Sequence, residues 1–447
     1  MKGLSNFSGL GYTRYIILNG KNCFVGLSDC WEHSTGNRHN RSKTGGIHIA
    51  KLSGKNEVMG CSMTTVENLV SRYREPLENA PLDLAAEWKK DHPEKKMVGC
   101  YPVYTPVELI HAAGMLPVGV IGAGNRLEIA HADSRFQSFI CSIVKSTLEL
   151  GLTEKLKFLD GIVFHSICDP ARNLGSVFKR NFPDLMVEYI HFPQNMTSPH
   201  TVDYLISEYK RLGASYEKLS GKKITDDALI KSIALYNEQR RLIRELYAIR
   251  RETPQNLSTV ECYVLTRIGT LLPPEEHIAI LREALPELRR RNEKPKDRIR
   301  VVLEGSFCEQ PPIELLEGLE AAGCYILDDD FLIGWRWFPE DISTDGDPMR
   351  NIAAAYINGS VYSGVKHDTR EPKSKHLIDK FKDTGADAVL ILAAKFCEPA
   401  LFDYALYKRA LEREGIPHLC LEFEEKMWIF DKARTEVETF VESMLFD

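Results

Sequence analysis

The sequence predicts an α/β fold with two doubly wound parallel-sheet domains, joined by a helical segment and preceded by a mixed N-terminal region. Short apolar segments typical of strands alternate with helical segments over residues 96–200 and again over 299–447. Such alternation is typical of a parallel sheet covered by helices on both faces. Between these halves, residues 201–298 keep apolar side chains at helical spacing. Residues 1–95 follow no clear period, so we expect only a mixed N-terminal region there.

The first half is expected to contain a four-stranded sheet. Its apolar segments predict strands at 98–100, 116–121, 158–164 and 186–190. A helix should begin at Pro106, because proline suits the first helical turn, and should end before Gly114. Residues 134–150 also have helical periodicity. Strands and helices therefore alternate along this half.

The pattern returns after a helical connection. In the connection, Thr225 precedes two acidic residues and predicts the start of one helix, and residues 275–290 predict another. Second-half strands are predicted at 299–304, 324–327, 386–394 and 418–422, with helices at 313–322 and 401–414. Because ligands of such sheets bind at the carboxyl ends of the strands, we expect the chemistry in the cleft between the halves.

Composition and charge exclude several classes of protein. The chain has 447 residues and a net charge of −6, with 43% hydrophobic and 27% charged residues. Basic residues are interspersed with acidic ones, which argues against a nucleic-acid-binding surface. A basic stretch over 289–300 is either a solvated linker or a surface for the phosphates of a CoA ester. No apolar run suits a membrane span or a secretory signal, so we expect a cytoplasmic protein.

The cysteine content points to metal or redox chemistry. Eleven cysteines are present, and disulfides are disfavoured in a reducing cytosol. None of the local spacings of zinc fingers or ferredoxins occurs. Cysteines that bind a metal centre must therefore converge from distant parts of the chain.

Three cysteines stand at positions where convergence is expected. Cys168 and Cys397 each follow a predicted strand, one in each half, and Cys141 stands at the start of a helical segment. Three thiolates at an interdomain cleft would bind a [4Fe–4S] cluster and leave one iron open to substrate. The alternative is that each cysteine is a small buried apolar residue.

Several segments resemble one known family. They include MVGCYPVYTPVELIHAAGMLPV, FQSFICSIVKSTLELG and FLDGIVFHSICDPAR in the first half, and LEGSFCEQPPIELLEGLEAAGCYILDDDFLIGWRW and ADAVLILAAKFCEPALFDYALYKRALEREGIPHLCLE in the second. Together they resemble the benzoyl-CoA reductase and 2-hydroxyacyl-CoA dehydratase family, from about residue 97 to the C-terminus. The resemblance implies a [4Fe–4S] cluster held by Cys141, Cys168 and Cys397.

The resemblance also implies an activity. We expect an iron–sulfur subunit of an ATP-dependent benzoyl-CoA reductase, of the longer B or O type, that reduces the aromatic ring to a cyclic dienoyl-CoA. The alternatives are a subunit of a 2-hydroxyacyl-CoA dehydratase that works through a ketyl radical, and an electron-relay or scaffold subunit without its own active site. The implied partners are a shorter homologous subunit in a heterotetramer, ATP-hydrolysing electron-activating subunits, a ferredoxin-type donor upstream and an aryl- or acyl-CoA substrate.

Other residues are candidates for supporting roles. Glu108 lies in the first turn of its helix, and the resemblance places it near the substrate as an acid–base group, whereas its structural role would be helix capping. His165 precedes Cys168 and is a second candidate for proton transfer. Cys100 and Cys308 follow predicted strands and suit a structural or supporting role, or a larger cluster. The glycines near residue 122 do not complete a dinucleotide-binding motif, and no P-loop occurs.

Overall fold

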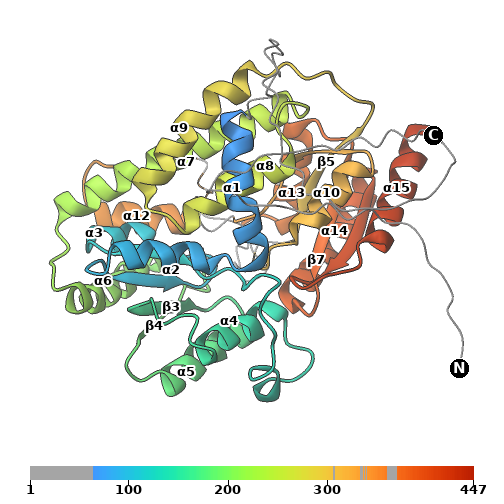
Figure 1. The fold of residues 1–447 in the computed structure, drawn as a ribbon. Helices are drawn as coiled ribbons and strands as arrows, with labels where there is room; N and C mark the ends of the chain where they lie inside the picture. Colours follow the sequence, from blue (N-terminus) through green and yellow to red (C-terminus); the bar gives the residue numbers. More distant parts are fainter. Residues whose placement is uncertain are drawn as a thin grey trace, which may run out of the picture. The chain divides into compact units, whose positions relative to one another are not determined.

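The computed structural model describes residues 64–305, 308–332, 336, 338, 340–359 and 370–446. Ser62–Asp447 form one compact unit. Within the described residues, strands occur in two four-stranded sheets, and every pair of neighbouring strands is parallel (Figure 1). The predicted fold class of two parallel-sheet halves is therefore confirmed.

The first sheet has the strand order β2-β1-β3-β4. Its strands are β1 (Met97–Cys100), β2 (Leu116–Gly119), β3 (Gly161–His165) and β4 (Met186–Ile190). The helices between them are α3 (Val107–Ala112), α4 (Ser142–Leu152) and α5 (Asp169–Asn181). Strands β1, β2 and β3 are buried along their whole length, as expected for a sheet covered on both faces.

The second sheet repeats this order as β6-β5-β7-β8. Its strands are β5 (Ile299–Glu304), β6 (Cys324–Asp328), β7 (Ala388–Ala394) and β8 (His418–Phe423). The helices of this half are α10 (Ile313–Ala321), α13 (Lys373–Thr384), α14 (Glu398–Glu414) and α15 (Asp431–Phe446).

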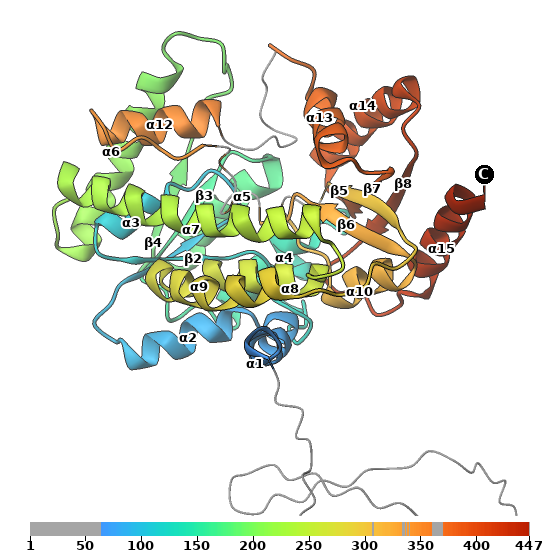
Figure 2. The same cartoon turned by 90° about the horizontal axis from the view of Figure 1, so that it is seen from above.

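Further helices pack around the two sheets. They are α1 (Thr65–Asn79), α2 (Leu82–Asp91), α6 (Thr201–Ser220), α7 (Asp226–Glu252), α8 (Thr259–Arg267), α9 (Pro274–Arg290) and α12 (Pro348–Asn358), with short 3₁₀ turns at Asp133–Arg135 and Ile268–Thr270. Thr225 caps α7 as predicted, since its hydroxyl accepts the amide of Ala228 at 3.2 Å. Helix α7 contacts both α3 and β6, so it joins the two halves (Figure 2).

One continuous hydrophobic core extends through both halves. It includes Val163 of β3 and Leu303 and Leu390 of the second sheet, all fully buried. The sheets are therefore held to one another by apolar burial rather than by a flexible linker. The predicted domain boundaries at 95, 200 and 298 stay predictions.

Two sequence-based expectations need correction. The helix predicted over 134–150 begins only at Ser142, because residues 136–141 precede it as non-helical chain after a short 3₁₀ turn. Part of the mixed N-terminal region is helical, as α1 and α2, while residues 1–63 lie outside the described residues. In the part of the chain that the structure describes, no helix has the length and hydrophobicity of a membrane span.

The strand order creates one special position in each sheet. The chain leaves β1 toward β2 on one side and reaches β3 on the other, so the order reverses between β1 and β3. The same reversal lies between β5 and β7. In open parallel sheets, ligands bind beyond the carboxyl ends of the strands at such a reversal.

Candidate functional site

Four cysteines line one narrow cavity at these strand ends. Cys168 follows β3, Cys308 follows β5 and Cys397 follows β7, and Cys141 joins them from the start of α4. Tyr101, directly after β1, lines the same cavity. The structure thus brings together the three cysteines predicted from the sequence and adds Cys308 to them.

Three of the four cysteines are helix N-caps. Cys141 precedes α4, Cys168 precedes α5 and Cys397 precedes α14. The unpaired amides at a helix N-terminus carry partial positive charge and favour anions. Three helix N-termini therefore direct positive potential at one cavity lined by thiols.

The same short motif places two of these cysteines. Cys168-Asp169-Pro170-Ala171 in the first half matches Cys397-Glu398-Pro399-Ala400 in the second. In both, proline stands in the first helical turn, where its missing N–H leaves no hydrogen bond unmade. In the second motif, Phe396 just before the cysteine has a φ of 62°, a left-handed conformation that non-glycine residues rarely adopt.

The protein alone disfavours ionised thiols in this cavity. Burial raises the pKa of the Cys397 thiol to about 12 and that of Cys168 above its ordinary value. Burial also raises the pKa of Cys308, and the neighbouring thiols Cys397, Cys168 and Cys141 raise it further. The amides of Ala171 and Ala400 act in the opposite direction, lowering the pKa of their cysteines. A metal centre would supply the positive charge that these thiolates lack.

The donor set suits a cluster better than a single ion. In the described part of the chain, no three His, Cys, Asp or Glu side chains are arranged to hold one metal ion. An iron–sulfur cluster is bound differently, because each thiolate binds its own iron atom. Sulfur ligands from four separate segments around one cavity fit that requirement.

A buried carboxyl group lies beside the cysteines. Glu309 lines the cavity and is 3% exposed. Its Oε1 accepts hydrogen bonds from the Ser142 hydroxyl and, at 2.8 Å, from the Glu425 amide. Burial raises the pKa of Glu309 to about 7. These contacts join the start of α4 to the chain that follows β5 and β8.

Glu425 in turn fills the glycine-rich loop after β2. Its Oε1 accepts the amides of Ala123 at 2.6 Å and Gly124 at 2.8 Å. Gly122, with a φ of +100°, leaves the room this carboxylate needs, since a Cβ there would overlap Glu425 Oε1. The loop amides therefore bind a carboxylate of the second half, which agrees with the incomplete dinucleotide motif.

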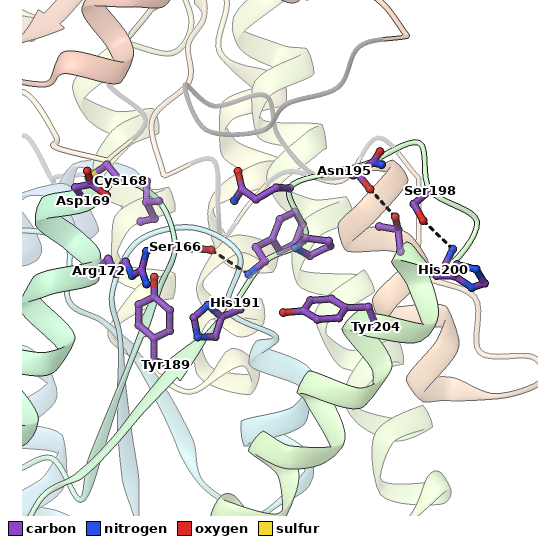
Figure 3. Close-up of a pocket in the computed structure, with 15 residues that line it drawn as sticks. Ser166, Cys168, Asp169, Arg172, Tyr189, His191, Asn195, Ser198, His200 and Tyr204 are labelled. Atoms are coloured by element: carbon purple, nitrogen blue, oxygen red, sulfur yellow. Dashed lines mark hydrogen bonds between the residues drawn. The ribbon is translucent and has the colours of Figure 1, made fainter.

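A wider pocket of about 660 Å³ opens on the other side of Cys168. Its wall is built from the ends of β3 and β4, the start of α5 and the chain leading into α6 (Figure 3). Polar and aromatic side chains surround the space, among them Arg172, Tyr189, His191 and Tyr204. Cys168 and Ile167 line both this pocket and the four-cysteine cavity. A ligand in the pocket would therefore lie against the Cys168 side of the metal site.

Glu108 lies elsewhere, in a buried ion pair. Its carboxylate is 2.6 Å from Arg240 Nη1, and both side chains are almost fully buried. The Arg240 guanidinium also stacks over the ring of Phe338, 4.4 Å from its centroid. Glu108 lines neither the four-cysteine cavity nor the wide pocket.

His165, the last residue of β3, is fully buried. Its Nε2 lies 2.5 Å from the Thr105 hydroxyl. Burial lowers the pKa of His165 to about 3, so the imidazole is neutral at ordinary pH. It lies three residues before Cys168 but lines neither space.

Comparison with known proteins now adds to this geometry. Residues 102–444 match the family model of the 2-hydroxyglutaryl-CoA dehydratase D-component. The chain belongs to this family. A benzoyl-CoA reductase subunit of Thauera aromatica is 38% identical over 383 residues, covering 86% of this chain and 99% of that protein. The lactoyl-CoA dehydratase subunit beta of Anaerotignum propionicum is 30% identical, covering 86% and 100%.

Family membership confirms the resemblance inferred from the sequence segments. The expectation that this chain is the longer, B- or O-type subunit of a reductase stays a prediction. An (R)-phenyllactyl-CoA dehydratase beta subunit of Clostridium sporogenes is also similar, at 29% identity over 78% of this chain and 92% of that protein. The family thus includes relatives named for reduction and relatives named for dehydration of CoA thioesters.

Sequence reasoning missed part of the site of this family member. The Glu309–Glu425 contact joins residues that are 116 positions apart, and no local pattern in the sequence signals it. The repeated Cys-acid-Pro-Ala motif was a visible signal for Cys168 and Cys397. Cys100 is fully buried and does not line the four-cysteine cavity. In the basic stretch, Arg289 pairs with Glu245, and Arg291 with Glu261.

Proposed function

We propose that this chain is the iron–sulfur subunit of an ATP-dependent benzoyl-CoA reductase. The observation that carries the proposal is the convergence of Cys141, Cys168 and Cys397, each at a helix N-terminus, on one cavity at the reversals of two parallel sheets. The similarity to a benzoyl-CoA reductase subunit over most of both chains supports the substrate.

In this proposal the three cysteines hold a [4Fe–4S] cluster. When bound, the cluster supplies low-potential electrons, received through ATP-hydrolysing partner subunits from a ferredoxin-type donor, one at a time. The cysteines supply negative charge to the iron atoms, and the N-termini of α4, α5 and α14 offset the net negative charge. Because the cavity is narrow, binding the cluster requires the cysteine side chains to move apart.

The wide pocket beside Cys168 is the proposed place for the CoA thioester. Its volume lies within the usual range of small-molecule sites. Arg172 offers a positive charge to a phosphate or thioester oxygen, and the rings of Tyr189 and His191 offer a surface for an aryl group. Reduction of benzoyl-CoA to the dienoyl-CoA adds two electrons and two protons to the ring.

Glu108 and His165 are the proposed groups for proton supply. Neither lines the pocket, so either would act through intervening groups. Glu108→Gln tests the role: turnover should be lost while iron content and subunit assembly survive. Unchanged turnover would leave Glu108 as a structural partner of Arg240 and would favour the electron-relay or scaffold alternative.

An apolar surface beside the site is the proposed contact with a homologous subunit. Phe402 and Leu406 of α14 are 74% and 50% exposed, and Trp428 and Ile429 after β8 are 67% and 73% exposed. Exposed apolar side chains that cluster are typical of protein interfaces. The N-terminal region, expected to be a further contact surface, lies for residues 1–63 outside the described residues.

The product identifies the reaction. Anaerobic complex with its activating subunits, ATP and a reductant should convert benzoyl-CoA to a cyclic dienoyl-CoA and consume two electrons per product. Cys420→Ala, which changes a cysteine outside the cavity, should keep this activity, and Cys397→Ala should lose it. Complex that dehydrates a 2-hydroxyacyl-CoA and leaves benzoyl-CoA unchanged would contradict the proposal.

The second candidate is a 2-hydroxyacyl-CoA dehydratase subunit. Matches to three dehydratase beta subunits favour it. That reaction consumes no net electrons, and its substrate would bind an open iron through a hydroxyl or carbonyl oxygen. The number of protein ligands to the cluster therefore bears on the choice between the two functions.

A further inference from the structure

Cys308 occupies a position in the site that a structural cysteine does not need. It follows β5, the direct neighbour of β7, whose following residue Cys397 lines the same cavity. The reversal of the second sheet thus places one cysteine beyond each of its two central strands. Cys100, which ends β1 in the first half, is buried away from this cavity.

The chain on both sides of Cys308 is fixed by hydrogen bonds. Before it, the Gly305 amide donates to Asp330 Oδ2 at 2.8 Å, with Gly305 at a φ of +108°. After it, Glu309 accepts the Ser142 hydroxyl and the Glu425 amide. The next side chain, Gln310, accepts the Leu332 amide at 3.3 Å. These contacts hold the segment against the start of α4, where Cys141 lies.

We infer that Cys308 is a fourth thiolate ligand of the cluster, so that every iron carries a protein ligand and the substrate is reduced without binding iron. This inference rests on the proposed function. It replaces the open iron expected from the sequence. With no open iron, no position is left for the hydroxyl or carbonyl oxygen of a dehydratase substrate.

The wide pocket agrees with this arrangement. Cys168 and Ile167 separate it from the four-cysteine cavity, since both residues line both spaces. An aryl-CoA in the pocket would meet a thiolate ligand and an apolar side chain rather than a bare iron. The electron would reach the ring across the Cys168 sulfur, and no bond between iron and substrate would form or break. A fully ligated cluster therefore suits ring reduction by an outside electron better than it suits dehydration.

Mild oxidation distinguishes three protein ligands from four. An iron without a protein ligand is the first to leave an oxidised [4Fe–4S] cluster, and the three-iron product has its own EPR signal. Wild-type chain, purified without air, should keep its iron and give no such signal. Cys308→Ala should lose about one iron in four and give the signal, while Cys100→Ala and Cys324→Ala should behave as wild type.

Each outcome has a fixed meaning. Iron loss and a three-iron signal in wild type would overturn the inference, as would a Cys308→Ala cluster that resists oxidation. If Cys308→Ala cannot be purified with a cluster, wild type alone decides: its EPR spectrum should not change when cyanide is added, and a change would overturn the inference. Absence of iron from every variant, wild type included, would instead contradict the proposed function.

Discussion

The two α/β halves share a strand order but differ in what stands beyond their first strands. Beyond β3 and β7 the halves agree, since Cys168 and Cys397 begin helices with the same Cys-acid-Pro-Ala motif. Beyond β1 stands Tyr101, whereas Cys308 stands beyond β5. Only the first half adds a wide pocket against its motif cysteine among the pockets described above. The comparison indicates that the second half is specialised for ligating iron and the first for admitting substrate.

The largest expected effect concerns the motif that the halves share. If Cys168 and Cys397 have equivalent roles, alanine at either position should remove nearly all the iron from the chain. Cys420→Ala, outside the cavity, should retain it. Iron and acid-labile sulfide after anaerobic purification measure this. Loss of iron in only one of the two variants would break the equivalence of the halves.

The next effect concerns the turn that leads to Cys308. At Gly305 a Cβ would lie 2.6 Å from the Leu392 carbonyl oxygen, and the φ of +108° disfavours other residues. Gly305→Ala should therefore lower the free energy of unfolding by roughly 3 kcal/mol. Gly318→Ala is the control, because nothing lies within 4 Å of its Cβ and a helical glycine gains about 0.5–1 kcal/mol on this change. Equal effects in denaturant titrations would show that the turn is not constrained.

A smaller effect depends on pH and on the first half alone. His165 stands three residues before Cys168, and Ala394 holds the corresponding place before Cys397. Because burial lowers the pKa of His165 to about 3, the unfolded chain binds this proton near pH 6.5 and the folded chain only near pH 3. Stability should therefore fall as pH falls through this window.

His165→Ala should remove that contribution and make the first half resemble the second. The slope of unfolding free energy against pH should decrease by about 1.4 kcal/mol per pH unit between pH 6 and pH 4. Thr105→Val, which keeps the histidine, should retain the slope. An unchanged slope in His165→Ala would mean that the histidine is protonated in the folded protein.

The smallest effect on stability is expected on the surface of α14. Phe402 is 74% exposed, so Phe402→Ser should change the free energy of unfolding by no more than about 0.5 kcal/mol. The same change should weaken association with the homologous subunit, as measured by sedimentation of the mixed subunits. Arg409→Ser, on the same helix, is the control. Unaltered association would place the interface between the two subunits elsewhere.

Much of the fold was predictable because the local signals agreed with it. The predicted bounds of β4 and β5 match the structure, since their apolar segments end at clear polar or glycine positions. Helix α4 was predicted too early, because Phe136 and Phe139 continue its apolar spacing into chain that is not helical. Helix α1 had a usable signal, the capping box of Thr64 and Glu67, although Pro76 within the helix obscures its pattern.

The site was predictable only as far as strand ends locate it. Cys168 and Cys397 follow strands that the sequence reveals, so their convergence could be expected. The contacts of Glu425 with Ala123 and of Asp330 with Gly305 join residues 302 and 25 positions apart. Such pairings depend on how the two halves pack, and no periodicity records that.

The central claim is that cysteines from both halves hold one iron–sulfur cluster. Its most direct test is the iron and acid-labile sulfide content of the wild-type chain, isolated without exposure to air, with Cys168→Ala beside it. The account predicts about four of each per wild-type chain and a sharp fall in the variant. Folded wild-type protein without iron would contradict it.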